Sequence, residues 1–289
     1  MLKVEDFERE LKRLVAELPV GSDLWLDSYR QGRQDESGCN SAINRQARAF
    51  LLYRNYAESG SRFLDWGCRH AWTSCMVRMV NSKATIEGCD IAEEIPQSTK
   101  NFAAMGYTPL KHAWKLPYSD DSFDRVISCG VLEHVPLLNA SLQELHRVTD
   151  PGGYLLITFL PNRLGYTEFV SRHVIKRSWH QRLYSKSRLK TKLLEHGFEP
   201  IEMGFHQVLP SFTAVHASRG GLGGTDDADD VQAGSAGGAY LAGEVVRGEY
   251  LRHCAQVRVP VDSLDGEKRR YKTRTGDYLD AGTDVRAGN

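Results

Sequence analysis

Hydrophobic and polar residues alternate along the chain in two rhythms, which predict helices and strands. Apolar residues recur at helical spacing between Val4 and Leu18, and a second helix is predicted from Ser41 to Glu58. From residue 62 onward, short apolar runs alternate with amphipathic segments. The first run predicts a strand that begins at Arg62. The later runs predict strands at Ala84–Asp90, Tyr107–His112, Phe123–Cys129 and Tyr154–Phe159. The segments between them predict helices at Ala71–Val80, Glu93–Met105 and Ser141–Val148.

Repeated strand–helix units imply parallel strands that are joined by right-handed crossovers. The predicted fold class is therefore α/β, a doubly wound and mostly parallel sheet with helices on both faces and an antiparallel edge. Residues 1–59 are predicted to form a helical extension, with a loop at 19–40. Residues 60–217 are predicted to form the main domain, which ends in a helix at Lys186–His196 and a strand at Phe198–Leu209.

Two segments depart from this rhythm. Residues 160–186 form a polar, basic and aromatic insertion directly after a strand, a position typical of lids and binding loops. Residues 218–289 are rich in Gly and Asp and are predicted to be largely disordered, because they have too little apolar surface to offset the entropy of ordering. Within this tail, residues 254–261 alternate and predict an edge strand.

Composition excludes several classes of function. The 289 residues include 37 basic and 37 acidic side chains, so no net field attracts nucleic acid or an anionic membrane. No apolar run reaches the length of a membrane span, and the charged N-terminus does not resemble a signal peptide. The six cysteines form no C-x-x-C pair, which predicts reduced thiols in a cytoplasmic protein. The expected partner is a small-molecule substrate.

Candidate binding residues stand at the ends of the first two strands. Asp65 and Gly67 follow the first strand, and Asp90 ends the second, 90 − 67 = 23 residues beyond Gly67. Ligands bind where a glycine turn leaves the carboxyl end of a strand, and an acid about 20 residues later can hold a ribose diol. These two elements alone leave open an ordinary strand–turn–helix that binds nothing.

Residues 60–210 resemble class I S-adenosylmethionine-dependent methyltransferases, which have a Rossmann-like fold. Five segments match in order: Leu64–Cys68, Gly88–Asp90, Leu116–Ser128, Val131–Val135 and Leu145–Ile157. The resemblance implies S-adenosylmethionine as cofactor. The cofactor contacts that it implies, by position in the shared motifs, are Asp65, Gly67, Cys68, Asp90, Ile91, His112, Ala113, Ser128, Cys129 and Gly130.

Three positions depart from the family pattern. Arg69 and Ala71 stand where family members usually have glycine, and His112 stands where they usually have an acid. A competing hypothesis is therefore a catalytically inactive binding protein whose cofactor pocket has eroded. A nicotinamide dehydrogenase is disfavoured, since the turn lacks the full G-x-G-x-x-G pattern that seats a pyrophosphate.

The predicted chemistry is methylation of a hydroxyl group on a saccharide or related metabolite. His134 is the predicted catalytic base, with helix capping or packing as the competing interpretation. No metal is predicted, because Gly130 stands where ubiquinone-pathway O-methyltransferases have a metal-binding carboxylate. The segments Leu160–Phe169 and His180–Ser185 resemble methyltransferases of bacterial surface-polysaccharide and glycolipid pathways. The predicted substrate contacts, which could instead tether the insertion, are Tyr166, His180, Arg182, Tyr184 and His206.

Overall fold

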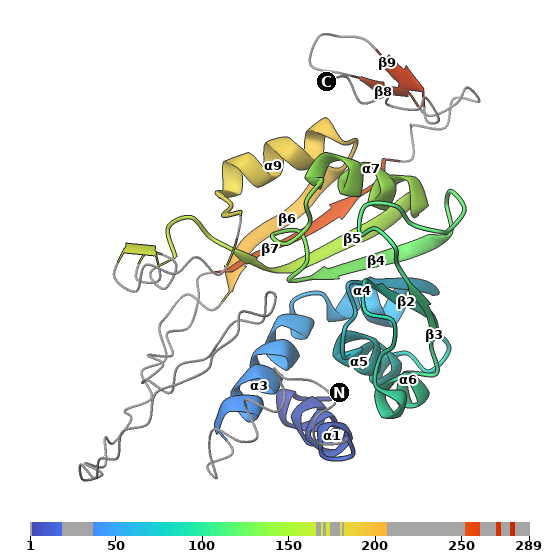
Figure 1. Cartoon of the computed structure of the whole chain (residues 1–289), viewed down its shortest axis with the longest axis vertical. Coiled ribbons are helices and arrows are strands. Elements are labelled where there is room, and N and C mark those ends of the chain that lie inside the picture. Colours follow the sequence, from blue (N-terminus) through green and yellow to red (C-terminus); the bar gives the residue numbers. More distant parts are fainter. Residues whose placement is uncertain are drawn as a thin grey trace, which may run out of the picture.

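A seven-stranded sheet forms the centre of the molecule (Figure 1). The computed structural model describes residues 2–18, 37–165, 169, 172–173, 180, 182–206, 252–260, 270–272 and 278–280. The strands of this sheet are β1 Arg62–Trp66, β2 Thr85–Asp90, β3 Gly106–Pro109, β4 Phe123–Cys129, β5 Thr149–Pro161, β6 Glu199–His206 and β7 Arg252–Arg258. Tyr166 and the residues between 207 and 251 lie outside the described part of the chain.

The order of the strands is β3-β2-β1-β4-β5-β7-β6. Strands β3, β2, β1, β4 and β5 are parallel neighbours, whereas β7 is antiparallel to both β5 and β6. This topology confirms the predicted doubly wound, mostly parallel sheet with antiparallel pairing toward one edge. Because β1 lies between β2 and β4, the carboxyl ends of these three strands meet at one place, where a ligand site is expected.

Strand β7 corrects the edge strand that was predicted at 254–261. The strand exists, but it lies between β5 and β6, so that β6 is the edge strand (Figure 1). Three consecutive residues, Ala255, Gln256 and Val257, are buried. Burial of consecutive residues is expected for an internal strand that is covered on both faces, and alternating polarity alone did not reveal it.

Helices cover both faces of the sheet (Figure 1). One face carries α1 Val4–Ala16, α3 Ser37–Leu51, α4 Arg54–Ser59, α5 Trp72–Val80 and α6 Gln97–Ala103, and the other carries α7 Leu138–Val148 and α9 Lys186–Glu195. The helix predicted from Ser41 to Glu58 is thus two helices with a break at residues 52–53. The helix predicted from Glu93 starts only after Pro96, whose extended backbone caps it.

The N-terminal helices share the core of the sheet. Phe7 of α1 and Phe50 of α3 are fully buried in the same apolar cluster as Phe63 of β1. The Arg125 guanidinium on β4 donates from Nε to the carbonyl of Tyr56 at 3.0 Å. The segment predicted as an extension at 1–59 is therefore, where described, one wall of the main core.

Two further differences from the predicted elements concern β5 and the tail. The Asp-Pro-Gly-Gly sequence at 150–153, interpreted as a sharp turn, lies inside β5, where a register shift against β4 accommodates it. In the tail predicted to be disordered, β8 Arg270–Lys272 pairs with β9 Tyr278–Asp280.

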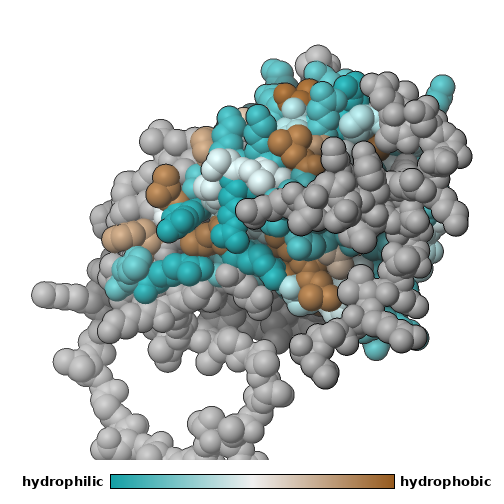
Figure 2. Space-filling model, turned by 90° about the horizontal axis from the view of Figure 1, so that it is seen from above, coloured by the Kyte–Doolittle hydropathy of each residue, from teal (hydrophilic) through white to brown (hydrophobic). Residues whose placement is uncertain are grey.

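The surface in Figure 2 shows apolar residues in separate groups among polar ones. The residues coloured there form no broad apolar patch on this face. Within the described part of the chain, no helix has both the length and the apolar character needed to cross a membrane.

Candidate functional site

The turn after β1 requires a glycine. Gly67 has a φ of +73°, and a Cβ atom built on it would lie 2.4 Å from Cγ2 of Val131. The amide of Gly67 donates to the carbonyl of Cys89 at 2.7 Å, which draws the turn across the end of β2. Only glycine combines this backbone conformation with the close approach of Val131.

The next turn residues adopt the same left-handed conformation without being glycine. Arg69 has a φ of +40° and Ala71 a φ of +55°. These are the two positions at which family members were expected to have glycine, so the backbone path is retained at a cost in strain. The Arg69 side chain is exposed, and its amide donates to Oδ2 of Asp90 at 3.0 Å.

Asp90 presents its carboxylate at the tip of β2. Oδ2 accepts from the Arg69 amide and Oδ1 accepts from the Ala92 amide at 3.2 Å. Each carboxylate oxygen can accept about two hydrogen bonds. Both oxygens of Asp90 therefore keep acceptor capacity beyond these two backbone contacts, as a pair of ribose hydroxyls requires.

Asp65 serves mainly to position helix α5. Its side chain is 2% exposed and accepts from the Ser74 amide at 3.2 Å and from the Ser74 hydroxyl at 2.6 Å. Burial raises the pKa of Asp65 to about 6, although the hydrogen bonds from Ser74 oppose this shift. Asp65 also lines the cavity described next, where the resemblance placed it beside the cofactor.

A cavity of about 1480 Å³ opens at the ends of β1, β2 and β4. Pockets for one small ligand usually measure about 300–1,000 Å³, so this cavity has room for a cofactor and an acceptor together. Most of the predicted cofactor contacts line it, namely Asp65, Gly67, Cys68, Asp90, Ile91, His112, Ala113, Cys129 and Gly130. Ser128 is buried behind its wall.

Residues that the sequence argument missed also line this cavity. Gln46 on α3 donates from Nε2 to Sγ of Cys129 at 3.0 Å and to Oγ1 of Thr73 at 2.9 Å. Glu17 and Leu18, just beyond α1, line it as well. No motif marks these positions, since only tertiary packing brings the N-terminal helices over the ends of β1 and β4.

Two aromatic rings lie on the side of the cavity where His112 is a predicted cofactor contact. His112 stacks on Trp114 with ring centroids 4.9 Å apart and 24° between the planes. Nε1 of Trp66 donates to the carbonyl of Ala113 at 3.2 Å, which fixes this loop against β1. The side chain of Ile91 is 70% exposed here and offers an apolar surface to a ligand.

Cysteine chemistry is disfavoured at this site. Cys129 lines the cavity, but burial raises the pKa of its thiol to about 11. The nucleophilic form of cysteine is the thiolate, which such a pKa suppresses at neutral pH. Burial also raises the pKa values of Cys68, Cys75 and Cys89 strongly, and all four described cysteine side chains are free thiols.

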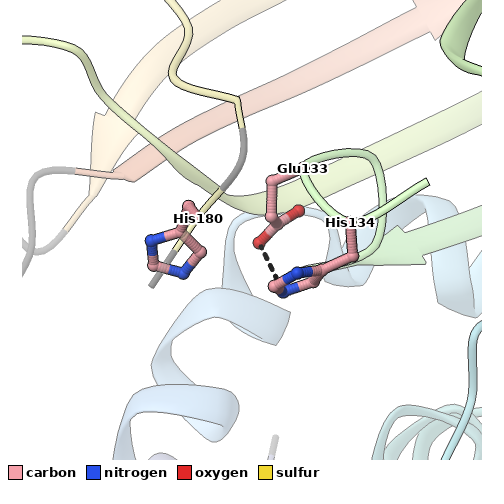
Figure 3. Close-up of side chains that lie close together, drawn as sticks. All are labelled: Glu133, His134 and His180. Atoms are coloured by element: carbon pink, nitrogen blue, oxygen red, sulfur yellow. Dashed lines mark ion pairs between the residues drawn. The ribbon is translucent and has the colours of Figure 1, made fainter. Parts of the chain in front are cut away.

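His134 and His180, which the sequence singled out separately, lie together (Figure 3). Their ring centroids are 5.6 Å apart. His134 also lies beside the buried carboxylate of Glu133, with 3.9 Å between Nε2 and Oε1. The His134 side chain is 55% exposed and lines the cavity, so it can contact a bound acceptor.

The other predicted substrate contacts have different surroundings. Tyr184 is 3% exposed and its hydroxyl donates to the carbonyl of Leu132 at 3.0 Å. Arg182 donates to the carbonyls of Val135 and Pro136. This geometry fits the competing interpretation, in which both side chains hold the insertion to the loop after β4, and their contact with a substrate stays a prediction. The backbone of His206 pairs with β7. The side chain of His206 and the whole of Tyr166 lie outside the part of the chain that the structure describes.

Comparisons with known proteins agree with this geometry. Residues 64–157 match the family model described as a methyltransferase domain. A solved S-adenosylmethionine-dependent methyltransferase from Methanosarcina mazei superposes with a TM-score of 0.50 at 14% identity, over 73% of this chain and 97% of that one. A chain of the Haloferax volcanii complex between the Trm112 methyltransferase activator and a methyltransferase gives 0.51 at 13% identity, over 78% and 95%. Residues 64–157 thus match a methyltransferase domain family, and the two solved structures share the fold of this chain.

The curated relatives are demethylmenaquinone methyltransferases. That of Staphylococcus epidermidis is 36% identical over 113 residues, which cover 38% of this chain and 47% of the relative. That of Geobacillus kaustophilus is 31% identical over 129 residues, which cover 42% and 55%. The chain spans about half the length of the curated relatives it matches. The narrower resemblance to enzymes of polysaccharide and glycolipid pathways stays a prediction.

Proposed function

We propose that this chain transfers a methyl group from S-adenosylmethionine to a small-molecule acceptor that carries an oxygen at or beside the methylated atom. The observation that carries the proposal is the Asp90 carboxylate, which stands beside the glycine turn at the mouth of the cavity. The matched methyltransferase domain family supports the same reaction.

The residues of the cavity fit this cofactor. The carboxylate of Asp90 is suited to two ribose hydroxyls, because it keeps acceptor capacity on both oxygens. The exposed face of Ile91 is suited to an aromatic base, and Gly67 lines the same cavity. When bound, S-adenosylmethionine supplies a methyl group activated by a sulfonium ion.

The protein's own contribution is alignment in a site shielded from water. Gln46 closes one side of the cavity by contacting both Thr73 and Cys129. His134 lies in the loop between β4 and α7 and lines the cavity, which supports a contact with the acceptor. A saccharide hydroxyl, as the sequence predicted, and a quinone-like ring, as the relatives' names suggest, both meet the proposed description of the acceptor.

Calorimetric titration of the full chain with S-adenosylmethionine tests the cofactor assignment. We expect saturable binding that Asp90→Asn weakens at least about tenfold, since a hydrogen bond to a charged group contributes roughly 1.5–3 kcal/mol. Asp120→Asn is the matched control, because it makes the same change at an acid that pairs with Arg147 at 2.8 Å outside the cavity.

Absence of binding at millimolar cofactor, or equal binding by both variants, would contradict the proposal. A parallel titration with NADH should show no saturation, which separates the proposal from a dehydrogenase. Supplying acceptors of the saccharide and quinol classes to the enzyme with labelled cofactor then identifies the product by mass spectrometry.

A further inference from the structure

Glu133, His134 and His180 form a cluster that the proposed function does not use as a unit (Figure 3). Each side chain offers one ligand atom, and these atoms all lie within 4.8 Å of one another. Glu133 and His134 follow β4, whereas His180 comes 180 − 134 = 46 residues later, from the insertion. Two imidazoles and a carboxylate therefore converge from two separate segments, and one of the three, His134, lines the cavity.

We propose that Glu133, His134 and His180 bind a divalent transition-metal ion. Two imidazoles and one carboxylate form a donor set that proteins use for Zn²⁺ in catalytic sites and for other first-row ions. Ca²⁺ and Mg²⁺ fit poorly, because they prefer oxygen ligands. The sequence argument against a metal relied on Gly130 and on the spacing of the other His and Cys residues. Spacing along the chain does not reveal that His180 of the insertion lies beside Glu133 and His134.

The surrounding contacts hold the two segments together. Arg182 and Tyr184 of the insertion donate to the carbonyls of Val135 and Leu132, on either side of the Glu133–His134 pair. Arg172 donates to the carbonyl of His180 at 2.8 Å. Side chains on a braced backbone can be brought together by an ion with little loss of entropy. The tethering of the insertion thus positions the three ligands.

The burial of Glu133 also favours a cation. Its side chain is 2% exposed, and a carboxylate is costly to bury unless positive charge or hydrogen bonds compensate it. A divalent ion supplies that charge. Ligand distances of about 2.0–2.1 Å require the cluster to contract, and the half-exposed His134 has room to move.

An ion at this cluster would meet the cavity through His134, which lines it. Three protein ligands leave at least one position for another oxygen donor, as in catalytic zinc sites. The role of His134 would then be to hold the ion that orients and polarises an acceptor oxygen, instead of taking a proton itself. Metal binding is a property of the three side chains and does not depend on the proposed cofactor.

The test is calorimetric titration of the untagged full chain, freed of metal by dialysis against chelator, with Zn²⁺ and separately with Co²⁺. We expect about one equivalent to bind, with visible ligand-field absorption from Co²⁺ that reports imidazole ligation. Glu133→Gln, His134→Ala and His180→Ala should each weaken binding at least about tenfold. His173→Ala, in the same insertion but outside the cluster, should leave it unchanged.

Absence of saturable binding, or equal binding by the wild type and all three cluster variants, would overturn the metal site. Thermal unfolding and S-adenosylhomocysteine binding verify that each variant is folded, and Glu133→Gln preserves the shape of its buried side chain. If Zn²⁺ binds as expected while the cofactor does not, the proposed function fails and the metal site stands. If the cofactor binds while Zn²⁺ does not, only the metal site fails.

Discussion

At the scale of single residues, Asp65 is a buried acid whose ionisation lowers the stability of the folded protein. Its pKa is raised by burial to about 6, above its usual value of 3.8. Such a group weakens folding once it must ionise inside the protein. The site retains it because its carboxylate accepts two hydrogen bonds from Ser74 at the start of α5, close to the cavity.

The sign of the pH dependence follows from this shift. Below about pH 4 the carboxyl is protonated in both the folded and the unfolded chain. Between pH 4 and 6 only the unfolded chain ionises, so the free energy of unfolding falls as pH rises, by about 3 kcal/mol in total. Above pH 6 the loss stays constant. Asp65→Asn should remove this component, because an amide does not ionise and still accepts from Ser74.

Urea denaturation of the wild type and Asp65→Asn at pH 4 and pH 7 measures this pH-dependent part of the free energy of unfolding. The stability of the wild type relative to the variant should be lower at pH 7 by about 3 kcal/mol. If the wild type and the variant differed in stability by the same amount at both pH values, ionisation of Asp65 would not destabilise the folded protein.

The left-handed backbone at Ala71 gives a second prediction at the residue scale. Ala71 and Ala47 are both fully buried, so replacement of either by glycine removes the same methyl group. At Ala71, with φ at +55°, glycine relieves about 1–2 kcal/mol of strain. At Ala47, inside α3, glycine costs about 1 kcal/mol more than alanine.

We therefore expect Ala71→Gly to be more stable than Ala47→Gly by about 2 kcal/mol in urea denaturation. Equal losses in the two variants would mean that the left-handed conformation at Ala71 carries no strain.

At the scale of elements, helices α1 and α3 act as part of the sheet domain. Phe50 packs edge-on against Phe7 and Tyr53, with ring centroids 5.3 and 5.2 Å apart. All three side chains belong to the cluster that lies on the face of the sheet with Phe63. Gln46 of α3 also reaches the cavity, so the same helix connects the core to the site.

Phe50→Ala should accordingly destabilise the whole domain by about 3–5 kcal/mol, because it leaves a cavity in a shared core. Intrinsic tryptophan fluorescence, to which Trp66 in β1 contributes together with four other tryptophans, follows the unfolding of the domain. Leu52→Ala is the matched control and should change stability by less than about 0.5 kcal/mol, since Leu52 is 43% exposed. If the tryptophan transition were unmoved by Phe50→Ala, the helices would be an independent extension.

At the scale of the whole molecule, a late segment of the chain completes the sheet. Strand β7 lies between β5 and β6, although more than 40 residues separate it from β6 in sequence. Its buried Ala255 and Val257 join the core cluster of the face that α7 and α9 cover. Gln256 on the same strand donates to the carbonyl of Leu52 at 2.7 Å, which links it to the N-terminal helices.

Truncation of the chain tests whether the fold requires β7. A chain that ends at residue 206 lacks β7, so that β5 and β6 lose their shared partner and expose unpaired edges. We expect it to aggregate or to lose cooperative thermal unfolding by circular dichroism. A chain that ends at residue 262 retains β7 and should unfold cooperatively near the temperature of the full chain. Equal behaviour of the two truncated chains would show that β7 contributes little to the fold.

Local patterns in the sequence were sufficient for much of this fold. The run Phe123–Cys129 predicts β4 with its observed bounds, because its apolar and β-branched residues lie between a polar turn and Gly130. The glycine turn at Gly67 and the acid at Asp90 were also predicted, since each depends on chemistry that a short segment displays. Boundaries failed where polar residues continue a strand, as at Thr149–Gly153 in β5.

What the sequence determined by itself was the order of strands and helices up to β5, the glycine turn and the acids at the strand tips, because short-range periodicity and backbone chemistry encode them. Tertiary structure alone decided the place of β7, the position of Gln46 in the lining of the cavity, and the meeting of Glu133, His134 and His180. These features join residues that are distant in the chain. Which distant residues meet depends on how whole elements pack, and no local pattern records that.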